Sequence, residues 1–260
     1  MDILSEIVAQ KRKEVADQKE LYPTKLLEKS IYYEGKPASL RKYLARGDKS
    51  GIIAEIKRKS PSKGDINKHV SVERTSIGYM QAGASGLSIL TDKQFFGGSI
   101  EDLKVARSFN FCPILRKDFM IDEYQVVEAK SIGADVILLI AAILGKEEIE
   151  KLGGLARSLG MEVLLEVHNE EELNSSITDS VDLVGVNNRN LKTFETSVEV
   201  AKSLADRIPD DFVKVAESGL SSPETVTELK GYGYSGFLIG ETFMKSGRPE
   251  RAAKEFISQM

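Results

Sequence analysis

The chain has 260 residues, of which 41% are hydrophobic and 29% charged, and its formal net charge is −4. This is the composition of an ordinary globular protein, and no basic stripe offsets the negative charge, so binding to nucleic acid or to an anionic membrane is not expected. The single cysteine, Cys112, excludes an intramolecular disulfide and a cysteine-rich metal site. The start of the chain lacks the pattern of a signal peptide, and no apolar stretch reaches transmembrane length, so we expect a cytoplasmic protein.

The first fifty residues form a segment of their own kind. They predict a helix from Ile3 to about Glu20, a break at Pro23, and two shorter helical pieces that end near Arg46. Such a segment is too short to bury a core comfortably, so we expect it to cap one end of a larger domain. The basic run Lys11-Arg12-Lys13 lies within the first helical pattern and is interpreted as a solvated face.

From residue 51 onward, apolar β-branched runs alternate with amphipathic helical patterns. Strands are predicted at Ile52–Ile56, Gly86–Leu90, Pro113–Leu115, Val136–Ile140, Val163–Val167, Leu183–Val186, Phe212–Ala216 and Gly236–Ile239. Helices are predicted at Val72–Ala82, Ser99–Ser108, Glu123–Ile132, Lys146–Leu159, Glu170–Ile177, Ser197–Arg207, Pro223–Tyr232 and Pro249–Ser258. Eight strand–helix units predict a closed (β/α)8 TIM barrel, whereas a doubly wound open sheet rarely runs to eight regular units. We therefore expect one domain over residues 1–260, with an extension at 1–50 and the barrel at 51–260.

Charged residues stand at the carboxyl ends of the predicted strands, where barrel enzymes build their sites. Residues two apart on a strand share a face, so each charge can cap a column of inward-facing apolar side chains. Three acids and three bases would then meet at one mouth: Glu55, Glu166 and Glu217 against Lys57, Lys117 and Arg189. A surface ion network is the alternative, but surface charges do not usually fall at the last position of strand after strand.

Two dipeptides, Ser218-Gly219 and Gly240-Glu241, follow the last two strands. Phosphate sites of barrels are commonly made from these two loops, so an organic phosphate is the expected ligand. The aromatic residues Phe95, Phe96 and Phe119 follow strands two and three and can be ordinary packing or a wall for a planar ring. The two histidines, His69 and His168, have no partner at metal spacing and receive no role.

Several of these motifs together resemble the indole-3-glycerol phosphate synthase family. The first is Ala-Glu-Ile-Lys-Arg-Lys-Ser-Pro-Ser-Lys-Gly at 54–64. The likeness continues at 90–92, 95–99, 113–119, 165–168, 185–191 and 217–219, and the helical extension is also typical of that family. The resemblance covers the chain from about Gly51 to Met244.

The resemblance implies a lyase of tryptophan biosynthesis that forms indole-3-glycerol phosphate from 1-(2-carboxyphenylamino)-1-deoxyribulose 5-phosphate, releasing CO2 and water. It implies Lys117 as general acid toward the ribulose carbonyl oxygen and Glu166 as its partner in later proton transfers. The implied catalytic set is Glu55, Lys57, Lys117, Glu166, Asn187 and Glu217. The implied substrate-binding set is Ser60, Pro61, Phe96, Phe119, Leu138, Arg189 and Leu191, with Arg189 and Ser60 facing the anthranilate carboxylate or sugar oxygens. The implied phosphate-binding set is Ser218, Gly219, Gly240 and Glu241, acting mostly through backbone N–H groups.

The same resemblance implies no cofactor and no metal, because the amine nitrogen of the substrate serves as the electron sink for decarboxylation. It also raises the expectation of association with other tryptophan-pathway enzymes. Glu241 departs from expectation, since a small residue would suit a phosphate loop better, and its side chain is expected to turn away. Two alternatives stay open: another phosphosugar barrel enzyme such as phosphoribosylanthranilate isomerase, and a catalytically silent phosphosugar-binding barrel. The loop at 60–64 has the composition of a lid that orders on binding.

Overall fold

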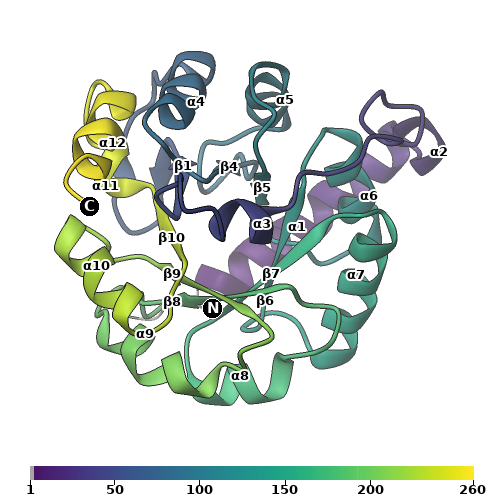
Figure 1. Cartoon of the computed structure of the whole chain (residues 1–260). Helices are drawn as coiled ribbons and strands as arrows, with labels where there is room; N and C mark the ends of the chain where they lie inside the picture. The colour runs from purple at the N-terminus through teal and green to yellow at the C-terminus, as the bar shows by residue number, and fades with distance from the viewer. Residues whose placement is uncertain (1–2, 192) are drawn as a thin grey trace.

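The fold is a closed barrel of eight parallel strands surrounded by helices (Figure 1). The computed structural model describes residues 3–191 and 193–260, so residues 1, 2 and 192 of the predicted extension and barrel lie outside the described residues. The barrel strands are β1 (Ile52–Ile56), β4 (Gly86–Leu90), β5 (Ile114–Lys117), β6 (Val136–Ile140), β7 (Glu162–Val167), β8 (Leu183–Asn187), β9 (Val213–Glu217) and β10 (Gly236–Ile239). β1 pairs with β4 on one side and β10 on the other, which closes the ring. The predicted TIM barrel is therefore confirmed, and the open sheet is excluded.

Each predicted helix is present to within a few residues. The helices around the barrel are α4 (Val72–Gln81), α5 (Ile100–Phe109), α6 (Glu123–Ser131), α7 (Lys146–Ser158), α8 (Glu170–Ser176), α9 (Glu199–Leu204) with the 3-10 turn η1 (Ala205–Arg207), α10 (Pro223–Gly231) and α12 (Pro249–Ile257). At α10 the Ser222 side chain accepts a hydrogen bond from the Thr225 N–H, and Pro223 takes the first helical position. Three short elements were not predicted: the hairpin of β2 (Lys59–Ser60) and β3 (Gly64–Asp65), and α11 (Glu241–Met244).

Alternation along the strands divides the apolar side chains between two cores. Ile53, Leu164 and Val215 belong to the cluster inside the barrel, whereas their neighbours Ile52 and Ala216 pack toward the helices. The expected columns of inward-facing apolar side chains are therefore present. The side chains two positions further along the inner face reach the mouth of the barrel.

The extension covers both ends of the barrel. Its helices are α1 (Ile3–Leu21), α2 (Thr24–Leu27) and α3 (Leu40–Leu44). Leu40 and Leu44 close the amino-terminal end, where they belong to the inner cluster and lie against the first residues of β4 and β10. Figure 1 shows α3 in front of the barrel and α1 behind it. The expected cap across one end was incomplete, because α1 reaches the opposite end.

The interpretation of the basic run at 11–13 was wrong for its first residue. Lys11 is buried and forms ion pairs with Asp92 and Asp118, at 2.9 Å in each case. Arg12 and Lys13 are exposed, as expected. Cys112 is buried in the core between barrel and helices.

Candidate active site

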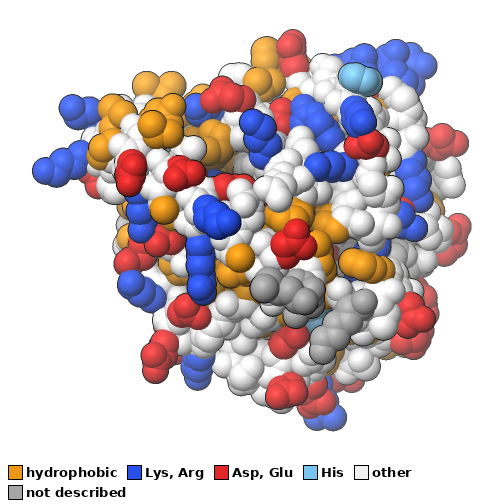
Figure 2. All heavy atoms as spheres, turned by 180° about the vertical axis from the view of Figure 1, so that it is seen from behind, with side chains coloured by type: hydrophobic (Ala, Val, Ile, Leu, Met, Phe, Trp, Pro, Cys, Tyr) orange, Lys and Arg blue, Asp and Glu red, His pale blue; other side chains and the backbone are white. Residues whose placement is uncertain are grey.

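A pocket opens at the carboxyl ends of the strands, on the face shown in Figure 2, where hydrophobic side chains lie among charged ones. The structure brings all of the predicted site residues together in its lining: Glu55, Lys57, Ser60, Pro61, Phe96, Lys117, Phe119, Leu138, Glu166, Asn187, Arg189, Leu191, Glu217, Ser218, Gly219, Gly240 and Glu241. Other lining residues were not predicted, among them Ile3, Leu4 and Ile7 of α1. The sequence predicted a helix that begins at Ile3 and caps one end of the domain, but it did not show that this helix would reach the site.

Lys117 is held between two buried carboxylates at the base of this pocket. Its Nζ lies 2.7 Å from Glu166 Oε2 and 3.1 Å from Glu217 Oε2. Asn187 Nδ2 donates to the other oxygen of Glu166 at 3.1 Å. Because β5, β7, β8 and β9 all end at the same mouth of the barrel, residues far apart in sequence form one acid–base cluster.

The two glutamates around Lys117 have different proton affinities. Burial raises the pKa of Glu217 to about 7, and the nearby Glu166 adds to this against the pull of Lys117. Burial also opposes the charged form of Glu166, but Lys117 and His168 more than offset it and lower its pKa to about 2. Burial alone would lower the pKa of Lys117, yet the surrounding carboxylates raise it well above its ordinary value. The site thus holds a protonated Lys117, an ionised Glu166 and a Glu217 whose pKa lies near neutral pH.

A second lysine–carboxylate pair lies at the end of β1. Lys57 Nζ is 2.9 Å from Glu55 Oε1, and Ser88 Oγ donates to Glu55 Oε2 at 3.1 Å. A Cβ at Gly240 would lie 2.6 Å from Glu55 Oε1, and one at Gly185 would lie 2.4 Å from Glu217 Oε1. These glycines make room for the two carboxylates, a packing reason that the sequence did not reveal.

Arg189 joins two loops at the rim of the pocket. Its Nη1 donates to Ser62 Oγ at 3.0 Å, and its Nη2 lies 3.3 Å from Glu241 Oε2. The predicted neighbour Ser60 lines the pocket, but the hydrogen bond goes to Ser62 in the turn of the β2–β3 hairpin. Glu241 Oε1 is also 2.8 Å from Lys245, so its side chain is engaged by two cations. Closure of this loop on a ligand stays a prediction.

The loop after β9 departs from ordinary backbone conformation at two consecutive residues. Ser218 and Gly219 both have positive φ, at 65° and 74°, and Asn188 Nδ2 donates to the Ser218 carbonyl oxygen at 3.1 Å. A Cβ at Gly219 would lie 2.8 Å from Thr196, so glycine is required there. Strained backbone at a pocket often serves a ligand. The first N–H groups of α11 have no intrahelical acceptor and lie beside this loop.

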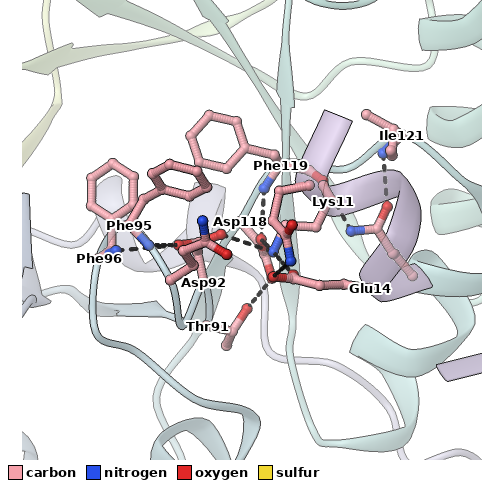
Figure 3. A network of polar contacts seen from close by, with 12 residues as sticks. Lys11, Glu14, Thr91, Asp92, Phe95, Phe96, Asp118, Phe119 and Ile121 are labelled. Atoms are coloured by element: carbon pink, nitrogen blue, oxygen red, sulfur yellow. Dashed lines mark hydrogen bonds and ion pairs between the residues drawn. The ribbon is translucent and has the colours of Figure 1, made fainter. Parts of the chain in front are cut away.

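Aromatic side chains form one wall, which is fixed from behind by buried charges (Figure 3). The rings of Phe96 and Phe119 lie 5.9 Å apart. Asp92 Oδ1 accepts hydrogen bonds from the Phe95 and Phe96 N–H groups at 2.7 and 3.2 Å, and Asp118 Oδ1 accepts one from the Phe119 N–H at 2.8 Å. Lys11 from α1 binds both carboxylates, so this helix is tied to the wall of the pocket.

One titratable residue beside the cluster was missed. His168 Nε2 lies 3.4 Å from Glu166 Oε1, and its Nδ1 lies 3.0 Å from Glu172 Oε2. The signal was available, because His168 follows Glu166 by two residues on the same strand face and precedes Glu172 by one helical turn. Only metal spacing had been considered for this histidine.

Within residues 3–191 and 193–260, no group of three or more His, Cys, Asp or Glu side chains could hold a metal ion. No helix in that part of the chain is long and apolar enough to cross a membrane.

Residues 4–256 match the family model described as indole-3-glycerol phosphate synthase. An indole-3-glycerol phosphate synthase of Bacteroides thetaiotaomicron is 50% identical over 256 residues, which cover 98% of both chains. That of Dechloromonas aromatica is 43% identical, covering 95% of this chain and 96% of the relative. Among solved structures, one described as a native KDPGal structure matches with a TM-score of 0.57 at 15% identity, covering 80% of this chain and 90% of that one. A mandelate oxidase variant matches with a TM-score of 0.58 at 12% identity, covering 80% and 71%. These two likenesses concern the fold alone.

Proposed function

The chain belongs to the indole-3-glycerol phosphate synthase family, and we propose from this premise that the cluster around Lys117 carries out the family's reaction. The chain is an enzyme, a carboxy-lyase of tryptophan biosynthesis. It converts 1-(2-carboxyphenylamino)-1-deoxyribulose 5-phosphate to indole-3-glycerol phosphate, with release of CO2 and water. Its substrate is therefore a phosphosugar that carries an anthranilate ring.

Ring closure begins with a proton donor at the ribulose carbonyl. Lys117 is proposed to protonate that oxygen while the aromatic ring carbon attacks the carbonyl carbon, forming the new C–C bond. The observation that supports this role is the position of the ammonium group, 2.7 Å from Glu166 and 3.1 Å from Glu217 at the base of the pocket. The carboxylates keep the lysine protonated, and general acid catalysis requires a proton in place before the bond forms.

Decarboxylation and dehydration complete the aromatic ring. Once the ring carbon is bonded, the substrate nitrogen becomes cationic and accepts the electron pair released as CO2 leaves. Glu166 is then proposed to take a ring proton, while an acid assists departure of the hydroxyl group. Glu55 and Lys57 would supply the second acid–base pair, and Asn187 and Glu217 would hold Glu166 and Lys117 in place. No step assigned to these residues needs a metal or an organic cofactor.

Binding is proposed to divide the pocket by chemistry. The anthranilate ring would lie against Pro61, Phe96, Phe119, Leu138 and Leu191. Arg189 and Ser60 would face the carboxylate or the neighbouring sugar oxygens, with Ser62 held by Arg189 at the rim. The phosphate would lie at Ser218, Gly219, Gly240 and Glu241 and be bound mainly by backbone N–H groups. Because Arg189 and Lys245 engage the Glu241 carboxylate, only its backbone is assigned to the phosphate.

The test is indole fluorescence on mixing the purified protein with the carboxyphenylamino-deoxyribulose phosphate, with no metal or cofactor added. The chain has no tryptophan, so the product signal is easy to see. Lys117→Ala should lower turnover by at least about 100-fold, because a general acid is worth 10²–10⁴ in rate, and should leave substrate binding largely intact. The control is Lys93→Ala, which removes an exposed lysine outside the pocket.

Each outcome points to one conclusion. Wild-type turnover in Lys117→Ala would place the general acid elsewhere. Saturable binding without any fluorescence rise would favour the silent barrel, and no binding would favour another phosphosugar.

We also propose that the enzyme works in the cytoplasm, without nucleic-acid or membrane partners, and associates with other enzymes of the tryptophan pathway. The support is its place in amino-acid biosynthesis. Fractionation of cells that express a tagged chain, followed by affinity purification, tests both statements. Recovery in a membrane fraction, or as a free single chain at physiological concentration, would count against them.

A further inference from the structure

The two carboxylates around Lys117 differ in how many groups stabilise their negative charge. Glu166 receives the Lys117 ammonium at one oxygen and the Asn187 amide at the other. Glu217 receives Lys117 at Oε2, while its Oε1 is buried and has no hydrogen-bond partner among the described residues. A buried carboxyl oxygen without a hydrogen-bond partner is the one that takes up a proton at the lowest cost in free energy. A further group that does not line the pocket also lies close to the Glu166 carboxylate.

That group is the imidazole of His168. Its Nδ1 is 3.0 Å from Glu172 Oε2, and the His168 backbone N–H donates to the same oxygen at 2.8 Å. Glu172 lies in the first turn of α8, where Asn169 binds its second oxygen at 3.1 Å. The His168 side chain is 10% exposed, and its contacts with Glu172 hold it with Nε2 toward Glu166, 3.4 Å from Oε1.

We propose that His168 is a positioning residue which, as an imidazolium between Glu172 and Glu166, keeps Glu166 ionised, so that the shared proton rests on Glu217. This inference rests on the proposed function, in which Glu166 must accept a proton. The titratable groups that face the ring are Glu172 from α8, Glu166 from β7 and Glu217 from β9, with Lys117 on the far side of Glu166. With the proton on Glu217, the ionised carboxylates of Glu166 and Glu172 against one more distant cation favour the charged imidazole.

Electrostatic balance explains why a second cation is useful. The Lys117 ammonium is nearly equidistant from the two glutamates and cannot by itself assign the proton to one of them. His168 breaks this near symmetry because its Nε2 reaches Glu166 alone at ion-pair distance. Two carboxyl groups whose environments push their pKa values apart can then serve as base and acid at one pH. In agreement, the pKa of His168 is raised above its ordinary value although burial acts to lower it.

The first experiment is an NMR titration of the histidine rings in the full chain, which needs no turnover. The chain has only two histidines, so His69→Asn leaves the His168 signal alone, and His69 is exposed and outside the pocket. We expect His168 to titrate above about 6.5, the ordinary histidine value, and Glu166→Gln to lower its pKa by about one unit. A pKa at or below the ordinary value, or one that Glu166→Gln leaves unchanged, would overturn the proposal.

The second experiment is the pH dependence of kcat/KM for His168→Asn. Without the imidazolium, the Glu166 pKa should rise, so we expect the acid limb to move up by about one pH unit and the defect to shrink as pH rises. KM should change little, because the ring does not line the pocket. Glu172→Gln should shift the limb in the same direction by less, since it weakens the charge on His168 without removing the ring.

The results separate this inference from the proposed function. A defect of the same size at every pH would leave His168 a packing role and reject the proposal. Absence of indole formation by the wild type would reject the proposed function alone, because the NMR titration would still decide the charge on His168.

Discussion

The carboxyl group of Glu217 titrates near neutral pH. Burial raises its pKa to about 7, so its protonated form is favoured in the folded chain. A folded-state pKa above the unfolded value means that the stabilisation is fully present below about pH 4.5 and is lost as pH rises through about 7. The protein should therefore become less stable across this window on account of Glu217.

Comparison with Glu217→Gln isolates this effect, since glutamine matches the protonated side chain in shape and does not titrate. Between pH 5 and pH 8 the stability of the wild type relative to this variant should fall by on the order of 2–3 kcal/mol. Urea unfolding of both proteins at the two pH values measures the change. A pH-independent difference in their unfolding free energies would show that Glu217 is already ionised at pH 5.

Site residues were predictable where the strand pattern alone locates them. Glu55, Lys117 and Glu166 stand at the ends of strands whose order and face follow from period-two alternation. His168 obeys the same parity, and it was missed because it was considered only as a metal ligand. Its spacing of two residues from Glu166 and four from Glu172 was readable in the sequence, but the two contacts that give it a charged surrounding were not.

Helix α1 contributes to the site through ion pairs that the sequence did not predict. Its Lys11 lies beneath the mouth of the barrel and binds Asp92 and Asp118, which in turn hold the backbone of the aromatic wall (Figure 3). Burial would lower the pKa of Lys11, but these carboxylates raise it well above the ordinary value. The lysine is therefore charged at all physiological pH values, and α1 is fixed over the pocket by ion pairs.

Lys11→Met should destabilise the fold by about 3–5 kcal/mol, because it leaves two buried carboxylates without their ammonium. It should also raise KM, since Ile3, Leu4 and Ile7 of the same helix line the pocket. Denaturant unfolding and steady-state kinetics measure the two effects. Adding Asp92→Asn should restore part of the stability, because the Asn Oδ1 can still accept from the Phe95 and Phe96 N–H groups.

The matched control is Lys19→Met, which removes a half-exposed lysine of the same helix paired with Asp122 at 2.7 Å. A surface pair of this kind is worth at most about 1 kcal/mol. If both methionine variants lost the same free energy of unfolding, the buried ion pairs of Lys11 would contribute no more to stability than the surface pair of Lys19.

Elements were predictable in proportion to their length. Strands of four or more residues and helices of two or more turns show their period, and these were placed within a few residues. The strands β2 and β3 have two residues each and α11 has four, so each holds only about one repeat, too little to show a period. They form because the barrel fixes the ends of their loops, which is tertiary information.

At the scale of the whole molecule, we propose that the extension at 1–50 and the barrel at 51–260 form one domain. Leu40 and Leu44 complete the inner core from the amino-terminal end. The Ala38 N–H donates to the buried Asp135 at 2.7 Å, and the Arg41 N–H donates to the partly exposed Glu162 at 3.1 Å, so the extension also binds polar side chains at strand starts. The sequence indicated that residues 1–50 need the barrel for their core. It did not show that α1 and α3 would cover opposite ends of the barrel, because a helical pattern does not tell which part of a neighbour the helix contacts.

Leu40→Ala tests this dependence. The side chain is fully buried against Gly86 at the start of β4, so its truncation should cost about 2–5 kcal/mol. If the chain is one cooperative unit, native-state hydrogen exchange should show the same loss of opening free energy for amides of α3 and for the slowest amides of β1 and β4. Leu21→Ala is the matched control, since that leucine is 66% exposed and its truncation should change stability by less than about 0.5 kcal/mol. A loss confined to amides before residue 50 would instead mean that the extension opens independently, and the single-domain proposal would have to be abandoned.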